Sequence, residues 1–104
     1  DETFDRNWAR TVLQRSRDHL RQAHRKAGKE EDFEVLKQFL DVGCELTAAA
    51  AGEQLGKSEG AIRMAVNRIR SDYRELIRRE IGDTIGPDES VDEEMKYLIG
   101  CLSA

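Results

Sequence analysis

The stretch from 47 to 81, TAAAAGEQLGKSEGAIRMAVNRIRSDYRELIRREI, constrains what this chain can fold into more than any other part of it. It begins with an alanine-rich segment, reaches a turn signal at Gly56, and continues into a longer segment whose apolar residues recur every three or four positions. That period is typical of a helix that buries one face. The stretch therefore predicts two helices joined by a tight turn.

The expected ends of these two helices carry residues with strong terminal preferences. Thr47 and Ser58 suit the N-cap position, because each hydroxyl can accept a hydrogen bond from an N–H group that has no partner inside the helix. Gly56 can adopt the left-handed backbone of the turn, and Gly52, one helical turn earlier, lets the second helix cross the first closely. Together they predict a helix-turn-helix.

The second helix is apolar on one side and basic beside it. Its expected core stripe contains Ile62, Val66, Ile69, Tyr73, Leu76 and Ile77, with Ala65 also inward. Beside the stripe, facing out, lie Arg63, Asn67, Arg70 and Arg74. Two interpretations remain: an amphipathic hairpin with solvated arginines, or a DNA-reading motif. The glycine spacing and Ser58 favour the motif, whereas Lys57 fits it poorly because such turns usually bury an apolar residue there.

The segment LGKSEGAIRMAVNRIRSDYRELIRREI resembles region 4, the promoter-reading end, of RNA polymerase sigma factors of the extracytoplasmic-function group. It is most similar to a branch with the pattern LG-x-[ST]-EGA-[IV]-[KR]-x-AV-x-R-[IL]-R-x-x-YREL. The preceding FDRNWARTVLQRSRDHLRQAHRKAGKEEDFEVLKQFL is similar to the segment before region 4 in that branch. Ala48 and Ala50 depart from the pattern, since relatives usually have an aromatic residue and a Glu there.

This resemblance implies a promoter-recognition protein whose second motif helix enters the major groove of the minus-35 element. The residues facing DNA would be Ser58, Glu59, Gly60, Arg63, Met64 and Asn67. Arg63 would meet guanine or phosphate, Asn67 adenine or phosphate, and the N–H groups of 58–60 a phosphate. Phosphate contacts or surface salt bridges would be the role of Arg68, Arg70 and Arg74. The helices before the motif would contact the flap of core RNA polymerase, where anti-sigma proteins also bind in this family.

The whole chain is expected to form an all-α helical bundle of about five helices, with no strand. Its three parts are the N-terminal helices (1–43), the helix-turn-helix DNA-binding region (44–85) and an acidic amphipathic helix (86–104). In the first part, residues 3–27 have an apolar face containing Phe4, Trp8, Val12, Leu20, Ala23 and Ala27. Residues 30–42, ended by Gly43, have one containing Phe33, Leu36, Phe39 and Leu40.

After a break at 85–88, which contains the only proline, Ser90 and Glu93 predict a capping box that starts the last helix. Its stripe contains Val91, Met95, Leu98, Ile99 and Leu102. A helix this short is not stable alone in water. It is therefore expected to complete the core or to cover the surface that binds polymerase.

Charge is unevenly distributed along a chain whose net charge is -4. Basic residues outnumber acidic ones seven to four in 1–28 and six to four in 59–82, whereas acids dominate seven to three in 29–58 and six to one in 83–104. The basic charge therefore falls on the first helix and the recognition helix. DNA and protein partners are expected to use different faces.

Several function classes find no support in the residues. There is no membrane-spanning run or signal peptide in this sequence, so a cytoplasmic protein is expected. Because the sequence begins at Asp1 without an initiator Met and nothing in it resembles the N-terminal region 2 of the sigma family, we expect a fragment of a longer chain. Cys44 and Cys101 are too few for a zinc cluster, and His19 and His24 do not share a helix face. No catalytic constellation or cofactor site is found, so an enzyme is not expected. The alternative to DNA recognition is a protein-interaction module that binds polymerase or an anti-sigma protein with little DNA affinity.

Overall fold

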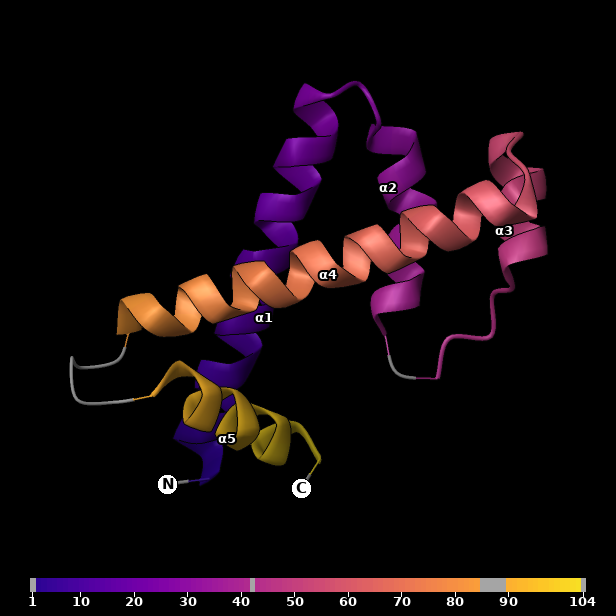
Figure 1. The fold of residues 1–104 in the computed structure, drawn as a ribbon. Coiled ribbons are helices and arrows are strands. Elements are labelled where there is room, and N and C mark those ends of the chain that lie inside the picture. The colour runs from indigo at the N-terminus through magenta and orange to yellow at the C-terminus, as the bar shows by residue number, and fades with distance from the viewer. Residues whose placement is uncertain (1, 42, 85–89, 104) are drawn as a thin grey trace. The chain divides into compact units, whose positions relative to one another are not determined.

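The computed structural model describes residues 2–41, 43–84 and 90–103, with side chains described for 7–41, 43–83 and 90–100. This part of the chain is all-α and contains no strand, which confirms the predicted fold class (Figure 1). The elements are α1 (Glu2–Lys26), α2 (Glu30–Leu36), the 3-10 helix η1 (Lys37–Leu40), α3 (Ala48–Leu55), α4 (Glu59–Thr84) and α5 (Val91–Ser103). The expected break at 85–88 and the side chains of Phe4 and Leu102 lie outside the described residues.

Two compact units divide the chain. The first contains residues 1–19 and 74–104, and the second contains residues 20–73. These units do not follow the three parts expected from the sequence, because the long helices α1 and α4 each contribute one portion to both units.

The first unit has a small core made by α1, the second half of α4 and α5. Its buried residues are Ala9, Val12, Ser16, Ile77, Ile81 and Leu98. Ser16 is the one buried polar residue among the described side chains, and its hydroxyl donates to the carbonyl of Val12 at 2.9 Å. That bond satisfies a group whose burial would otherwise be unfavourable.

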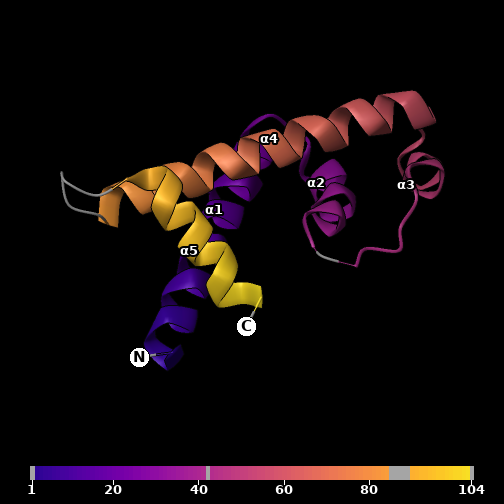
Figure 2. The ribbon, with the colours of Figure 1, turned by 60° about the horizontal axis from the view of Figure 1, so that its bottom comes forward.

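Helix α5 contributes to this core, in agreement with the core-completing alternative. Figures 1 and 2 show α5 beside the first half of α1 and the second half of α4. Leu98 is 2% exposed, the rings of Trp8 and Tyr97 lie 6.2 Å apart, and Arg78 donates to Asp92 at 2.5 Å. The prediction that Ile99 also belongs to the buried stripe is wrong, because Ile99 is 56% exposed and lies about 100° around the helix from Leu98.

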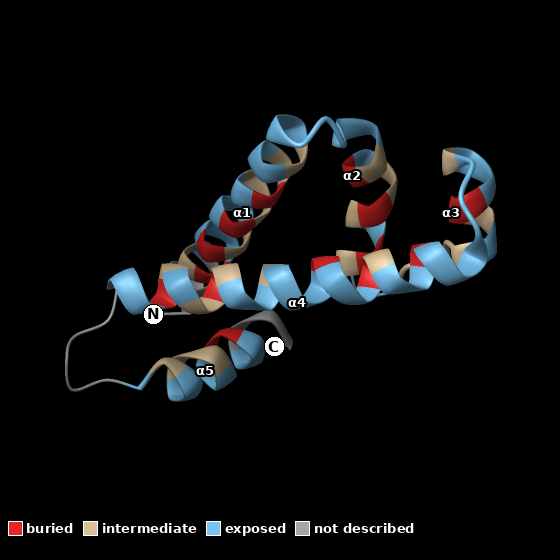
Figure 3. Ribbon diagram, turned by 45° about the horizontal axis from the view of Figure 1, so that its top comes forward, coloured by how far each residue is buried: buried red, intermediate tan, exposed pale blue. Residues whose placement is uncertain are grey.

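The second unit has its own core, built from the end of α1, α2, η1, α3 and the first half of α4. Figure 3 shows buried positions as red bands on one side of each helix. The buried residues are Leu20, Phe33, Leu36, Phe39, Ala51, Ile62, Val66 and Ile69. Phe33 is 1% exposed and is covered by His24, whose ring centroid lies 5.2 Å away, and by Arg21 at 5.7 Å.

Two predictions for the N-terminal helices need correction. The expected helix over 30–42 is split, since α2 tightens into η1 after Leu36 and the helical backbone ends at Leu40, before Gly43. Ala23 and Ala27, which the spacing places on the buried face of the expected helix over 3–27, are both exposed, and Ala27 lies just beyond the end of α1. Helical spacing alone did not reveal that Phe33 of α2 packs against the side of α1 that carries Arg21 and His24.

Candidate nucleic-acid interface

Three hydrogen bonds fix the start of α3, the tight turn between α3 and α4, and the start of α4. Thr47 caps α3 by accepting the N–H of Ala50 at 3.1 Å, and Ser58 caps α4 by accepting the N–H of Ala61 at 3.1 Å. Gly56 has φ 67° and ψ 34°, and the N–H of Lys57 donates to the carbonyl of Gly52 at 2.9 Å. This combination of a left-handed glycine and a long-reach bond is a Schellman-type helix end. The predicted caps and the left-handed Gly56 are therefore confirmed.

Gly52 is required by the turn itself as much as by the crossing helix. A Cβ atom on Gly52 would lie 2.5 Å from the carbonyl oxygen of Lys57 and 3.6 Å from a side-chain carbon of Ile62. The first of these distances is far below van der Waals contact. Only glycine at this position allows the turn to fold back over α3 and still bring Ile62 into the core.

Lys57, which fits the sequence pattern poorly, has a specific partner. Its ammonium group lies 2.6 Å from a carboxylate oxygen of Asp32 in α2. The ion pair ties the turn to α2, and its two side chains are 44% and 20% exposed. Nothing in the local sequence pointed to this contact, because the two residues are 25 positions apart.

The first three turns of α4 present exposed residues beside and opposite the buried stripe. Ile62, Val66 and Ile69 are buried, while Ser58, Glu59, Gly60, Arg63, Met64 and Asn67 are all exposed. By the 3.6-residue repeat, Asn67 lies about 130° around the helix axis from the buried stripe. We call the exposed residues Glu59, Gly60, Arg63, Met64 and Asn67 the outer face of α4.

The outer face combines the amide of Asn67, the guanidinium of Arg63 and the apolar side chain of Met64. Met64 is 75% exposed, and Gly60, one turn before it, has open space where a side chain would be. Arg63 is 70% exposed and lies 2.6 Å from a carboxylate oxygen of Glu59. This ion pair lies across one helical turn and neutralises part of the basic charge of the face.

The start of α4 offers backbone donors beside this face. The first N–H groups of any helix have no intrahelical partner, and they form the positive end of the helix dipole. Ser58 uses its hydroxyl to satisfy the N–H of Ala61. The N–H groups of Glu59 and Gly60 remain at the exposed end of the helix, where an anion can approach.

The three remaining sequence-predicted arginines are not equivalent. Arg70 is exposed, but its Nε donates to the carbonyl of Phe39 at 3.2 Å, so it holds the end of η1. Arg68 is exposed on another side of α4, about 100° around the axis from Asn67. Arg74 is exposed and belongs to the other compact unit. Only Arg63 of the predicted arginines therefore belongs to the outer face of α4.

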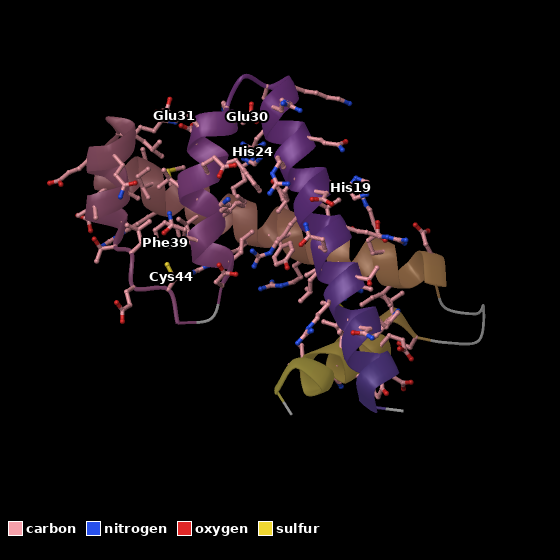
Figure 4. The ribbon with its side chains drawn as sticks, turned by 180° about the vertical axis from the view of Figure 1, so that it is seen from behind. His19, His24, Glu30, Glu31, Phe39 and Cys44 are labelled. Carbon is pink, nitrogen blue, oxygen red and sulfur yellow. The ribbon has the colours of Figure 1, made fainter. Side chains whose placement is uncertain are left out.

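The histidines and the described cysteine have local protein partners. His19 lies 3.3 Å from Glu80, which is also 3.9 Å from Arg15. His19 and His24 both lie on α1 (Figure 4). The Nδ1 of His24 is 2.8 Å from the carbonyl of Leu20 and, because a carbonyl oxygen only accepts, Nδ1 donates to it. The Cys44 thiol is directed at the carbonyl of Leu46 at 4.0 Å. Within the described residues, no three His, Cys, Asp or Glu side chains are grouped as metal ligands.

Comparisons with known proteins and a search for membrane spans add two findings. No family model, curated protein or solved structure matches the chain. Among the described residues, none of the helices has the length and apolar character needed to cross a bilayer. A functional proposal for this chain therefore rests on its own residues and their geometry.

Proposed function

We propose that this chain reads promoter DNA as the region-4 part of a sigma factor, with α3 and α4 acting as a helix-turn-helix. The observation that carries the proposal is the outer face of α4. Its first three turns are held to the core by Ile62, Val66 and Ile69, while Arg63, Met64 and Asn67 have no role in packing. A helix anchored in this way can enter the major groove without disturbing the fold.

The chemistry of the outer face suits base edges of more than one kind. The guanidinium of Arg63 can donate two hydrogen bonds to guanine, the amide of Asn67 can pair with adenine, and the exposed Met64 offers an apolar contact for a thymine methyl group. The N–H groups at the start of α4 can take a phosphate. The proposed target is the minus-35 element, in keeping with the resemblance to the sigma family.

Core RNA polymerase and an anti-sigma protein are the proposed protein partners. Core RNA polymerase, through its flap, would bind the helices that precede α3, and an anti-sigma protein would compete for that surface. The chain would act in the cytoplasm, by binding rather than by catalysis, and without a cofactor.

A second candidate is a protein-interaction module with little DNA affinity. It is favoured by the ion pair between Glu59 and Arg63, since the Glu59 carboxylate lies beside the proposed reading residue and repels phosphate. Such a module would bind polymerase or an anti-sigma protein and would retain that binding when the outer face of α4 is changed.

Selection from a random duplex library separates the two candidates. The full chain would be used to enrich sequences over several rounds, and the binding of the enriched duplex would be compared with that of an unrelated one. Recovery of one motif whose preference depends on Arg63 supports DNA reading. Failure to enrich any motif, together with measurable binding to core polymerase, supports the interaction module.

A further inference from the structure

The part of α4 that points most directly away from the core is apolar. Successive residues of a helix are about 100° apart, so Met64 lies about 165° around the axis from the centre of the buried stripe. By the same count Gly60, one turn earlier, lies about 155° from that centre, whereas Arg63 lies only about 95° from it. Gly60 and Met64, which we call the Gly60–Met64 surface, therefore project furthest from the core.

Met64 is the most exposed of the large apolar side chains in the described part of the chain. It is 75% exposed, whereas Tyr97 and Ile99, the other two, are 47% and 56% exposed and belong to the other compact unit. A single methionine is too small for a protein-docking patch, which typically covers on the order of several hundred Å². Its flexible, polarisable thioether is instead suited to covering one small apolar group.

Gly60 leaves open space beside Met64. A Cβ atom on Gly60 would meet no atom within 4 Å, so the side chain of Met64 does not fill this space. Neither residue has a side-chain N–H or O–H group. The Gly60–Met64 surface therefore offers room and an apolar contact to a small group, without a side-chain hydrogen bond.

The polar side chains of the outer face lie to one side of this surface. Arg63 is paired with Glu59 at 2.6 Å, and Glu59 is closer still to the buried stripe, at about 55° around the axis. Asn67, at about 130°, is the polar side chain nearest to Gly60 around the axis. An amide in this position suits adenine, so the part of α4 that would enter the major groove most deeply favours A·T pairs.

We infer that the Gly60–Met64 surface binds the C5-methyl group of a pyrimidine in the major groove. Thymine carries this methyl group on its major-groove edge, and cytosine carries it only when it is methylated at C5. The chain therefore distinguishes thymine from uracil and 5-methylcytosine from cytosine, and its DNA binding is sensitive to cytosine methylation. This inference rests on the proposed function, because it assumes that the outer face of α4 enters the major groove. It goes beyond that function by naming a modified base as a ligand.

The test uses the full chain and the duplex motif enriched from the random library. Each thymine is replaced in turn by uracil, which keeps its pairing and its O4 atom and lacks only the methyl group, and each cytosine by 5-methylcytosine. At one position of the motif, uracil should lower the affinity, or 5-methylcytosine should raise it, by roughly fourfold, the value for burying one methyl group. The same replacements outside the motif are the duplex control and should leave the affinity unchanged.

Substitutions of the chain connect this effect to the Gly60–Met64 surface. Met64→Ala should abolish the discrimination at that position, and Met64→Leu should retain much of it. Gly60→Leu should also abolish it, because a bulky side chain then fills the open space. Leucine favours a helix more than glycine does, so loss of folding would not explain that result, and thermal unfolding checks this. Ser71→Ala is the matched control, since Ser71 is exposed on the same side of α4 two turns further on.

The outcomes separate this inference from the proposed function. If a motif is enriched and depends on Arg63, but no position responds to the methyl group, the inference is overturned and the proposed function survives. Methyl discrimination that persists in Met64→Ala would place the contact elsewhere and would also overturn the inference. If no motif is enriched at all, the proposed function fails and the inference fails with it. Discrimination at one position that depends on both Gly60 and Met64 supports the inference.

Discussion

The side chain of Arg70 donates a hydrogen bond from Nε to the backbone carbonyl of Phe39 at 3.2 Å, which joins α4 to the last residues of η1. The two residues are 31 positions apart. Phe39 is buried, and η1 ends at the next residue, Leu40, so the bond lies where the chain leaves the core of the second unit. An arginine expected to contact DNA phosphates or to form surface salt bridges therefore stabilises the fold through a backbone carbonyl.

Replacing Arg70 with Ala should lower the free energy of unfolding by about 1 kcal/mol, because a part-buried carbonyl loses its charged donor. Arg70→Lys should recover little of this, since lysine lacks the Nε–H that makes the bond. Urea denaturation monitored by circular dichroism measures the change. Arg74→Ala serves as the control, because Arg74 is exposed and belongs to the other unit. Equal stability of the Arg70→Ala and Arg74→Ala variants would show that the bond contributes nothing.

Gly52→Ala should destabilise the chain by about 1–3 kcal/mol, as expected when an atom is forced into a packed site. The added Cβ would lie 2.5 Å from the Lys57 carbonyl oxygen, which is backbone and cannot turn away. Gly60→Ala should instead raise stability by up to about 1 kcal/mol, because its Cβ meets no atom and alanine favours a helix. Thermal unfolding of the two variants compares them directly. A Gly52→Ala variant as stable as the parent would contradict the geometry of the turn.

Arg63→Ala should weaken binding to a selected duplex by about 1–3 kcal/mol and relax base preference if Arg63 reads a base edge. A uniform loss on all sequences would instead identify a phosphate contact. Fluorescence anisotropy with selected and unrelated duplexes provides the measurement. Unchanged binding to the selected site would exclude this face of α4 from the major groove.

Leu98→Ala should cost about 2–5 kcal/mol, the range for a buried leucine, because Leu98 is 2% exposed in the core of the first unit. Ile99→Ala is the matched control at the next position. It should change stability by less than about 1 kcal/mol, since Ile99 is 56% exposed. Chemical denaturation of both variants measures the difference, and similar losses from the two substitutions would contradict the docking of α5 through Leu98.

Truncation after Gly86 tests what α5 does for function. If α5 completes the core, the truncated chain should melt at a lower temperature than the parent. If α5 covers a polymerase-binding surface instead, the truncated chain should keep its melting temperature and bind core polymerase more tightly. Calorimetry and a polymerase pull-down together distinguish the two results.

Several features of this protein follow from local sequence alone. The caps at Thr47 and Ser58, the left-handed Gly56 and the buried series Ile62, Val66 and Ile69 agree with the predicted pattern. Each depends on residues within one or two helical turns, where spacing determines which groups meet. For the same reason the exposed positions of the outer face of α4 were predictable, although their role in reading DNA remains a proposal.

Which faces of these helices are covered depends on tertiary packing and not on local sequence. Ala23 and Ala27 have the spacing of core residues but line a groove, whereas Ser16, a polar residue, is fully buried. Lys57 pairs with Asp32, and Arg70 with Phe39, across 25 and 31 positions. Helical periodicity specifies the angle of a side chain around its own axis, but burial depends on which other helix lies against that angle. That depends on how distant segments pack, and no local pattern of residues encodes it.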